Sequence, residues 1–192
     1  AYNLLAVYGV SQLLGFESTE ALTLISKLEN VTGRFQHFIS NEGITAIIDY
    51  AHTPDALQNV LETINDIRTG NEQVITVVGC GGDRDKAKRP IMGRIASQIS
   101  TQVIFTSDNP RSENPQTILN EMEAGVDPQN FRKTLSVLDR TQAIKTATKL
   151  AKKGDIILIA GKGHETYQEI KGVRSHFDDY EKISQLLKAI EK

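Results

Sequence analysis

Two patterns of hydrophobic positions alternate along most of the chain. Short, nearly continuous apolar runs occur at residues 45–49, 74–78, 103–106, 134–138 and 156–160. Segments with the apolar spacing of helices lie between them, at residues 54–68, 90–99, 115–124 and 140–152. Three of these segments begin with a proline, which the first turn of a helix tolerates. The pattern therefore predicts strands that alternate with helices.

The predicted strands are apolar at almost every position, which favours burial on both faces. Such strands are typical of a parallel sheet with a layer of helices on each side. We therefore expect an α/β fold with a doubly wound, mostly parallel sheet. Near the end of the chain, Gly172 separates two short extended pieces within residues 167–177. This segment predicts a β-hairpin, followed by a last helix from Asp178.

The first part of the chain has a different texture. Residues 2–30 contain helical apolar spacing and no strand pattern. Gly15 is suited to end one helix, and Ser18 or Thr19 to begin the next. The sequence predicts a short helical segment over residues 1–32 and a separate body over residues 33–192.

Composition narrows the class of protein. The chain has 192 residues, 39% of them hydrophobic, and its 22 basic and 24 acidic residues give a net charge of -2. This balance predicts a globular protein and argues against nucleic acid as a partner. The apolar runs are too short to cross a bilayer, and no secretory leader opens the chain, so we expect a cytoplasmic protein with no membrane partner. The single cysteine, Cys80, excludes an internal disulfide.

Polar loops follow four of the predicted strands. They are DYAHTPD (49–55), GCGGDRD (79–85), SDNPR (107–111) and GKGHE (161–165). The carboxyl ends of parallel strands meet at one edge of a sheet, where ligands of open α/β folds bind. The connections predicted for the opposite edge are ordinary polar turns. This asymmetry predicts a ligand site at the carboxyl edge.

The charges in these loops are of both signs. They belong to Asp49, Asp83, Arg84, Asp85, Asp108, Arg111, Lys162 and Glu165. A phosphate pocket would be mostly basic and a metal cage mostly acidic, whereas paired arginines and acids suit a ligand with carboxylate and ammonium groups. The loops therefore favour an amino acid as the ligand.

Three other chemistries fit the sequence less well. The glycines at 79–82 lack the third glycine of a dinucleotide fingerprint, because Arg84 stands in its place. His164 and Glu165 begin an H-E-x-x-H zinc pattern, but position 168 is glutamine. Cys80 could act as a nucleophile with a histidine from a neighbouring loop, or it could be a small buried thiol.

Five motifs together carry a family resemblance. GRFQ (33–36) and the four loops, with GCGGDRD extended to GCGGDRDKAKRP (79–90), resemble in identity, order and spacing the carboxy-terminal domain of the Mur ligases. The resemblance covers the whole chain and is strongest to members that add meso-diaminopimelate to UDP-N-acetylmuramoyl-L-alanyl-D-glutamate. It implies an ATP-dependent, amide-forming ligase of bacterial peptidoglycan precursor synthesis. In these enzymes ATP, with Mg²⁺, converts the D-glutamate side chain to an acyl phosphate, which the incoming amine attacks.

The resemblance also implies roles for individual residues. Those that match diaminopimelate-binding positions are Arg84, Asp108, Asn109, Pro110, Arg111, Gly161 and Glu165. Arg111 would bind the distal carboxylate through two hydrogen bonds, Asn109 would add one through its amide, and Glu165 would accept from the distal ammonium. Pro110 would stiffen the loop. Those that match positions near ATP are Arg34, Asp49, Tyr50 and His52, with Arg34 on the phosphates and Asp49 on the ribose.

One expected motif is missing from this sequence. The chain contains no G-x-x-x-x-G-K-[ST] phosphate loop, and GKGHE does not satisfy that pattern. The resemblance places the phosphate loop, most Mg²⁺ ligands and a carbamylated lysine in a central domain, so we expect no metal site in this chain and no activity from it alone. Residues 1–32 would be the end of that central domain. Two alternatives remain, a lysine-adding Mur ligase and a non-catalytic amino-acid-binding module. The resemblance disfavours the first, because lysine-adding relatives lack an arginine where Arg111 stands.

Overall fold

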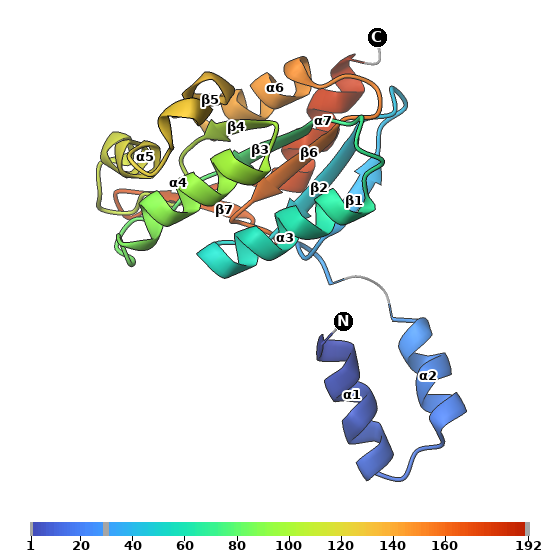
Figure 1. Ribbon diagram of the computed structural model, residues 1–192. Helices are drawn as coiled ribbons and strands as arrows, with labels where there is room; N and C mark the ends of the chain where they lie inside the picture. The colour runs from blue at the N-terminus through green and yellow to red at the C-terminus, as the bar shows by residue number, and fades with distance from the viewer. Residues whose placement is uncertain (1, 29–30, 191–192) are drawn as a thin grey trace. The chain divides into compact units, whose positions relative to one another are not determined.

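The computed structural model describes residues 2–28 and 31–190, and the chain divides into two compact units between Val31 and Thr32 (Figure 1). The first unit consists of helices α1 (Tyr2–Leu13) and α2 (Ser18–Ser26). Gly15 lies between them with a φ of 83°, in the left-handed region that ends helices. The predicted helical segment that precedes the sheet is confirmed; residues 29–30, within its expected range, lie outside the described residues.

The second unit is built on a six-stranded sheet in the order β1-β2-β6-β3-β4-β5. Its strands are β1 (Gln36–Ile39), β2 (Thr45–Asp49), β3 (Val74–Val78), β4 (Gln102–Phe105), β5 (Thr134–Ser136) and β6 (Ile156–Ala160). Its helices are α3 (Pro54–Ile67), α4 (Lys88–Ile99), α5 (Pro115–Glu123), α6 (Arg140–Leu150) and α7 (Asp179–Ile190). Strands β7 (Tyr167–Ile170) and β8 (Val173–His176) form the predicted hairpin as a separate two-stranded sheet.

The expected doubly wound, mostly parallel sheet is confirmed. Strand β1 is the exception, because it pairs antiparallel with β2 at the edge. This strand and the 3-10 helix at Pro128–Lys133 were not predicted from the sequence. Helix α4 was expected to start at Pro90, whereas it begins at Lys88, and the proline still lies within its first turn.

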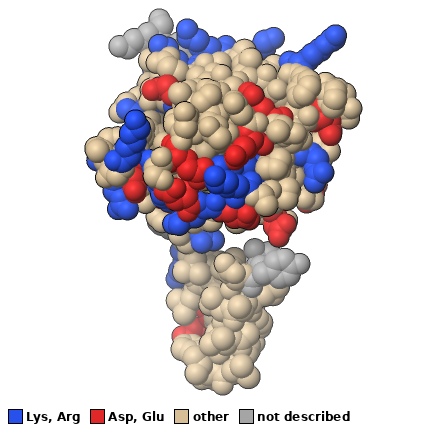
Figure 2. Space-filling view, turned by 90° about the vertical axis from the view of Figure 1, so that its left-hand side faces the viewer, with Lys and Arg blue, Asp and Glu red and all other residues tan. Residues whose placement is uncertain are grey.

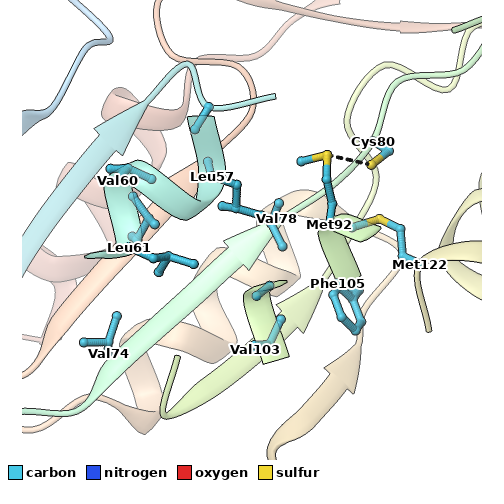
Figure 3. Close-up of a cluster of buried hydrophobic side chains, with 14 of the residues drawn as sticks. Leu57, Val60, Leu61, Val74, Val78, Cys80, Met92, Val103, Phe105 and Met122 are labelled. Atoms are coloured by element: carbon cyan, nitrogen blue, oxygen red, sulfur yellow. Dashed lines mark hydrogen bonds between the residues drawn. The ribbon is translucent and has the colours of Figure 1, made fainter. Parts of the chain in front are cut away.

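Apolar side chains fill the space on both sides of the sheet, while the face seen in Figure 2 carries intermixed acidic and basic side chains. Strand residues alternate between the two sides, as the pleat requires. Helices α3, α4 and α5 cover one side, where Leu61 and Met92 join Val78 and Phe105 in the core (Figure 3). Helices α6 and α7 cover the other side, where their apolar side chains contact the alternate strand residues. This burial holds the loops at the ends of the strands in place.

No helix among the described residues is both long and apolar enough to cross a membrane.

Candidate ligand-binding site

A cleft of about 540 Å³ opens at the carboxyl edge of the sheet. The strand order explains how it forms: Asp49, Ala160, Val78 and Phe105 end four adjacent strands and pair in register across the sheet. The loops that follow therefore start side by side, although they are far apart in the sequence. The cleft is lined by Tyr50, His52, Thr53, Pro54, Gly81, Arg84, Asp85, Ala87, Lys88, Ile91, Asp108, Asn109, Arg111, Gly161, Glu165 and Tyr167.

Glycines allow the loops to approach one another closely. Gly82 donates its N–H to the Asn109 carbonyl at 2.9 Å, and a Cβ on Gly82 would collide with the Pro110 carbonyl. Gly161 has a φ of 116°, and a Cβ there would lie 2.7 Å from the Asp108 carboxylate. Only glycine fits at both positions. The glycines of the loops thus have a packing role at the edge of the cleft.

The loop that carries Arg111 is joined to strand β7 by an isolated β-bridge between Arg111 and Ile170. The Arg111 N–H donates to the Glu169 carbonyl at 3.0 Å, and the Arg111 carbonyl accepts from Lys171 N–H at 2.7 Å. Arg111 has a φ of 52°, which is uncommon for a residue other than glycine and is found at functional sites. Its Nη1 donates to the Gly82 carbonyl at 2.7 Å, which directs the guanidinium across the cleft edge.

Asn109 and Glu165 are connected directly at the floor of the cleft. Asn109 is 2% exposed, and its Nδ2 donates to Glu165 Oε2 at 2.8 Å. The Asn109 Oδ1 accepts from the Glu169 N–H and from Lys162 Nζ, both at 3.0 Å. The neighbouring Asp108 carboxylate lies 3.8 Å from Lys162 Nζ. Two acids, an amide and a buried cation are thus packed together beneath the ligand space.

The buried side chain of Arg89 connects two of the loops. Arg89 is fully buried and forms ion pairs with Glu113 at 2.8 Å and with Glu121. Its Nη2 also donates to the Gly81 carbonyl at 3.3 Å. The hydrogen bonds from Arg89, with one from the Asp83 N–H, lower the pKa of Glu113 to about 2. Because Glu113 follows the Arg111 loop, this network fixes that loop against the glycine loop.

A second buried arginine supports the loops from below. Arg140 and Asp179 are both fully buried, and their side chains form two hydrogen bonds of 2.7 and 2.8 Å. Arg140 also donates to the carbonyls of Ser107 at 3.3 Å and Ala160 at 3.1 Å, where two site loops begin. Burial lowers the pKa of Arg140, but the Asp179 carboxylate outweighs it and leaves the pKa raised. The pair therefore ties helices α6 and α7 to the site.

The residues expected near ATP are only partly brought together. Tyr50 and His52 line the cleft, and the Tyr50 ring lies 4.5 Å from the His52 ring and 5.1 Å from the His164 ring. Asp49 lies outside the lining, and its Oδ2 accepts from the Phe35 N–H at 2.7 Å. Burial raises the pKa of Asp49. Arg34 is exposed and does not line the cleft.

Of the residues expected to hold the amino acid, all except Pro110 line the cleft. Pro110 is buried behind it, and its carbonyl accepts from the Glu113 N–H at 3.0 Å. Sequence reasoning missed Lys88, Tyr167 and Ile91 in the lining and the buried positions of Lys162 and Arg89. Lys162 stands within GKGHE, so its place at the edge was visible, but its burial was not.

The structure also bears on two other chemistries, a nucleophilic cysteine and a metal site. Cys80 is 2% exposed, its Sγ lies 3.6 Å from Met92 Sδ in the core, and burial raises its pKa to about 12 (Figure 3). It is a buried thiol and has none of the thiolate character of a nucleophile. No group of three or more His, Cys, Asp or Glu among the described residues could hold a metal ion.

Comparison with known proteins gives consistent results. The family model described as "Mur ligase, glutamate ligase domain" matches residues 33–163. A UDP-N-acetylmuramoyl-L-alanyl-D-glutamate–2,6-diaminopimelate ligase from Parabacteroides distasonis is 59% identical over 97% of this chain and 38% of its own length. The enzyme with the same name from Cytophaga hutchinsonii is 59% identical over 100% of this chain and 39% of its own. The chain thus spans less than two-fifths of the curated relatives it matches.

Solved structures agree with the fold and with this relationship. A structure of a UDP-N-acetylmuramoyl-L-alanyl-D-glutamate–2,6-diaminopimelate ligase superposes with a TM-score of 0.77 at 41% identity, over 99% of this chain and 38% of that one. A UDP-N-acetylmuramate–alanine ligase from Thermotoga maritima, at 18% identity and a TM-score of 0.66, shares the fold.

Proposed function

The chain belongs to the Mur ligase family, and we propose that it is the amino-acid-binding, C-terminal domain of a ligase. The ligase would add meso-diaminopimelate to UDP-N-acetylmuramoyl-L-alanyl-D-glutamate in peptidoglycan precursor synthesis. One observation carries the proposal: a single cleft gathers Arg84, Arg111, Asp108 and Glu165 from three loops. Cationic and anionic groups in one space suit a ligand with two carboxylates and an ammonium. The names of the relatives support the same substrate.

In the proposed reaction, ATP supplies the phosphoryl group that activates the D-glutamate carboxylate. This chain presents the amine of diaminopimelate, which attacks the activated carbonyl carbon; phosphate leaves, and the nitrogen loses a proton. Arg111 would bind the distal carboxylate, and Asn109 would donate its second Nδ2 hydrogen to it. Glu165 would accept from the distal ammonium through Oε1, because Asn109 occupies Oε2. Fixing the far end of the substrate in this way positions the reacting end.

We assign the nucleotide to the other side of the cleft. The rings of Tyr50, His52 and His164 form an aromatic surface that suits a base, and exposed Arg34 suits phosphates. Asp49 would reach the ribose only with the oxygen that Phe35 does not occupy. The Mg²⁺ ions would be held mainly by protein outside this chain, because the described residues offer no cluster of ligands for them.

The helical unit, with the linker up to residue 32, would be the end of the neighbouring ATPase domain. The chain by itself should release no phosphate from ATP, since it lacks the G-x-x-x-x-G-K-[ST] loop. The wild-type complete ligase, in contrast, should turn over diaminopimelate. A complete ligase without such turnover would contradict the proposed function.

Arg111→Ala in the complete ligase tests the substrate assignment. Loss of the charge-assisted contact should lower kcat/KM for diaminopimelate about ten- to hundredfold, because one carboxylate is left unpaired in the cleft. The KM for ATP should stay nearly constant. Arg68→Ala is a matched control, since Arg68 ends α3 at the opposite edge of the sheet and donates to the Glu72 carbonyl. An unaltered preference for diaminopimelate over lysine in folded Arg111→Ala would contradict the assignment.

A further inference from the structure

Lys162 is a fully buried lysine directly beneath the cleft. It is not one of the lining residues, and it has no role in the proposed reaction so far. Its Nζ donates to the Tyr167 carbonyl at 2.6 Å and to Asn109 Oδ1 at 3.0 Å. Carboxylate oxygens of Glu165 and Asp108 lie 3.5 and 3.8 Å away. Four acceptor oxygens surround this nitrogen. An ammonium suits such surroundings, because it donates hydrogen bonds and accepts none.

The first consequence of this contact is the orientation of the Asn109 side chain. Lys162 Nζ and the Glu169 N–H both donate to the same Asn109 oxygen, so the amide nitrogen must face Glu165. An amide turned the other way would set donor against donor. Lys162, together with the Glu169 N–H, therefore fixes which atom Asn109 presents to the ligand.

The second consequence concerns the charge of the site. Three cationic and three anionic side chains line the cleft: Arg84, Lys88 and Arg111 face Asp85, Asp108 and Glu165. These charges balance, as do those of the buried Arg140–Asp179 pair below. Lys162, which does not line the cleft, adds one cation to this balanced set of lining residues. The lining residues and the lysine beneath them together carry one more cation than acids.

This excess charge matches one class of amine substrate. An amine must be neutral to attack a carbonyl carbon, so diaminopimelate in its reacting form has two carboxylates and one ammonium, a net charge of -1. Lysine in its reacting form has one carboxylate and one ammonium, and is neutral. A cation beneath the cleft therefore stabilises the first ligand more than the second.

We propose that Lys162 is a specificity-determining residue, which favours an amino acid with a second carboxylate over its neutral analogue through its buried charge and its hold on Asn109. The inference rests on the proposed function and deepens it, because Arg111 contacts the ligand whereas Lys162 acts through other groups. Burial lowers the pKa of Lys162, and the Asp108 and Glu165 carboxylates oppose that shift. A purely structural lysine would affect folding alone and leave the preference between substrates unchanged.

Three substitutions in the complete ligase separate charge from shape. Lys162→Met removes both charge and hydrogen bonds, Lys162→Gln removes the charge and keeps a donor for Asn109, and Lys162→Arg keeps the charge. The measurement is kcat/KM for diaminopimelate divided by kcat/KM for lysine in one preparation. This ratio does not depend on the folded fraction, since both values scale with it. Lys153→Met, an exposed lysine at the opposite edge, is the control.

The ratio should fall roughly tenfold in Lys162→Met and Lys162→Gln, and stay near the wild-type value in Lys162→Arg and Lys153→Met. Where turnover of a variant is too low to measure, the ratio of dissociation constants from titration replaces it. An unchanged ratio in the Met and Gln variants would overturn the inference. So would an equal fall in all three Lys162 variants, because shape would then set the preference. Absence of wild-type turnover with diaminopimelate would instead reject the proposed function.

Discussion

The helical unit and the α/β unit differ in how far they bury their apolar side chains. In the α/β unit these side chains fill two cores, one on each side of the sheet. In the helical unit, Ala21 is the one apolar side chain buried among those described. Large side chains such as Leu13, at 88% exposure, and Leu14, at 71%, face solvent. The α/β unit thus buries its apolar side chains within itself, whereas the helical unit leaves most of its own exposed.

The sequence of α1 explains the difference. YNLLAVYGVSQL has apolar residues around the whole helix, a pattern typical of helices that are buried on all sides. A pair of helices has too little surface to bury both of its members. Exposed apolar surface of this kind marks a place where other protein binds. It fits the proposal that this unit completes a neighbouring domain. Substitutions in the α/β unit should therefore change the free energy of unfolding of this chain far more than substitutions in the helical unit.

The largest effect should come from breaking the buried ion pair of the α/β unit. Arg140→Met leaves the Asp179 carboxylate fully buried without its cation, which should lower the free energy of unfolding by about 3–5 kcal/mol. Urea denaturation of the chain measures this. The double variant Arg140→Met with Asp179→Leu removes both charges and should recover most of the loss. A double variant as unstable as the single one would show that the carbonyl contacts of Arg140, and not the charge pair, carry the stability.

A slightly smaller loss should follow from a cavity in the core. Leu61 on α3 is fully buried between the helix and the sheet, so Leu61→Ala removes packed atoms that little can replace (Figure 3). The expected cost is about 2–4 kcal/mol in the free energy of unfolding. A cost below 1 kcal/mol would mean that this side of the core repacks easily, and the contrast between the units would be weaker than proposed.

The strands of the sheet illustrate what the sequence could and could not predict. Three strands, among them β2 and β6, were predicted to the residue, because an apolar run stops where a polar loop begins. Strand β1 was missed because Gln36–Ile39 is short and lies at an edge, where alternation is weak. The insertion of β6 between β2 and β3 could not be predicted, since pairing between strands distant in sequence leaves no local pattern.

The candidate site, too, could be predicted only in part from the sequence. Its four loops were predicted, because each follows an apolar run and carries Gly, Asp or Arg. The burial of Lys162 and Arg140 was not, because a charged residue is buried only when partners far along the chain neutralise it. Arg140 and Asp179 are 39 positions apart, and Asn109 and Glu165 are 56 apart. Local patterns therefore locate a site, and the fold decides which charges lie within it.

Acidification should weaken the α/β unit through Glu113. Its pKa is about 2 in the folded chain against an ordinary value of 4.5, so the ionised form stabilises the fold above about pH 4.5. That contribution is lost as the pH falls from about 4.5 towards 2, when the carboxylate gains a proton. Glu113→Gln should lower stability at pH 7 and make it depend less on pH in this window. Urea midpoints between pH 7 and 2.5 test this, with exposed Glu62→Gln as the control; parallel curves for wild type and Glu113→Gln would contradict the role.

The smallest effect is expected at Leu13 in the helical unit. Because the side chain is 88% exposed, Leu13→Ala removes few contacts and should change the free energy of unfolding by less than about 0.5 kcal/mol. In the complete ligase, where we propose that other protein covers this surface, the same substitution should cost about 2 kcal/mol or more, as burial elsewhere does. Denaturation of both forms, with and without the substitution, provides the comparison. Equal, small effects in the two forms would mean that Leu13 stays exposed in the complete enzyme, and that the helical unit does not bury this face against another domain.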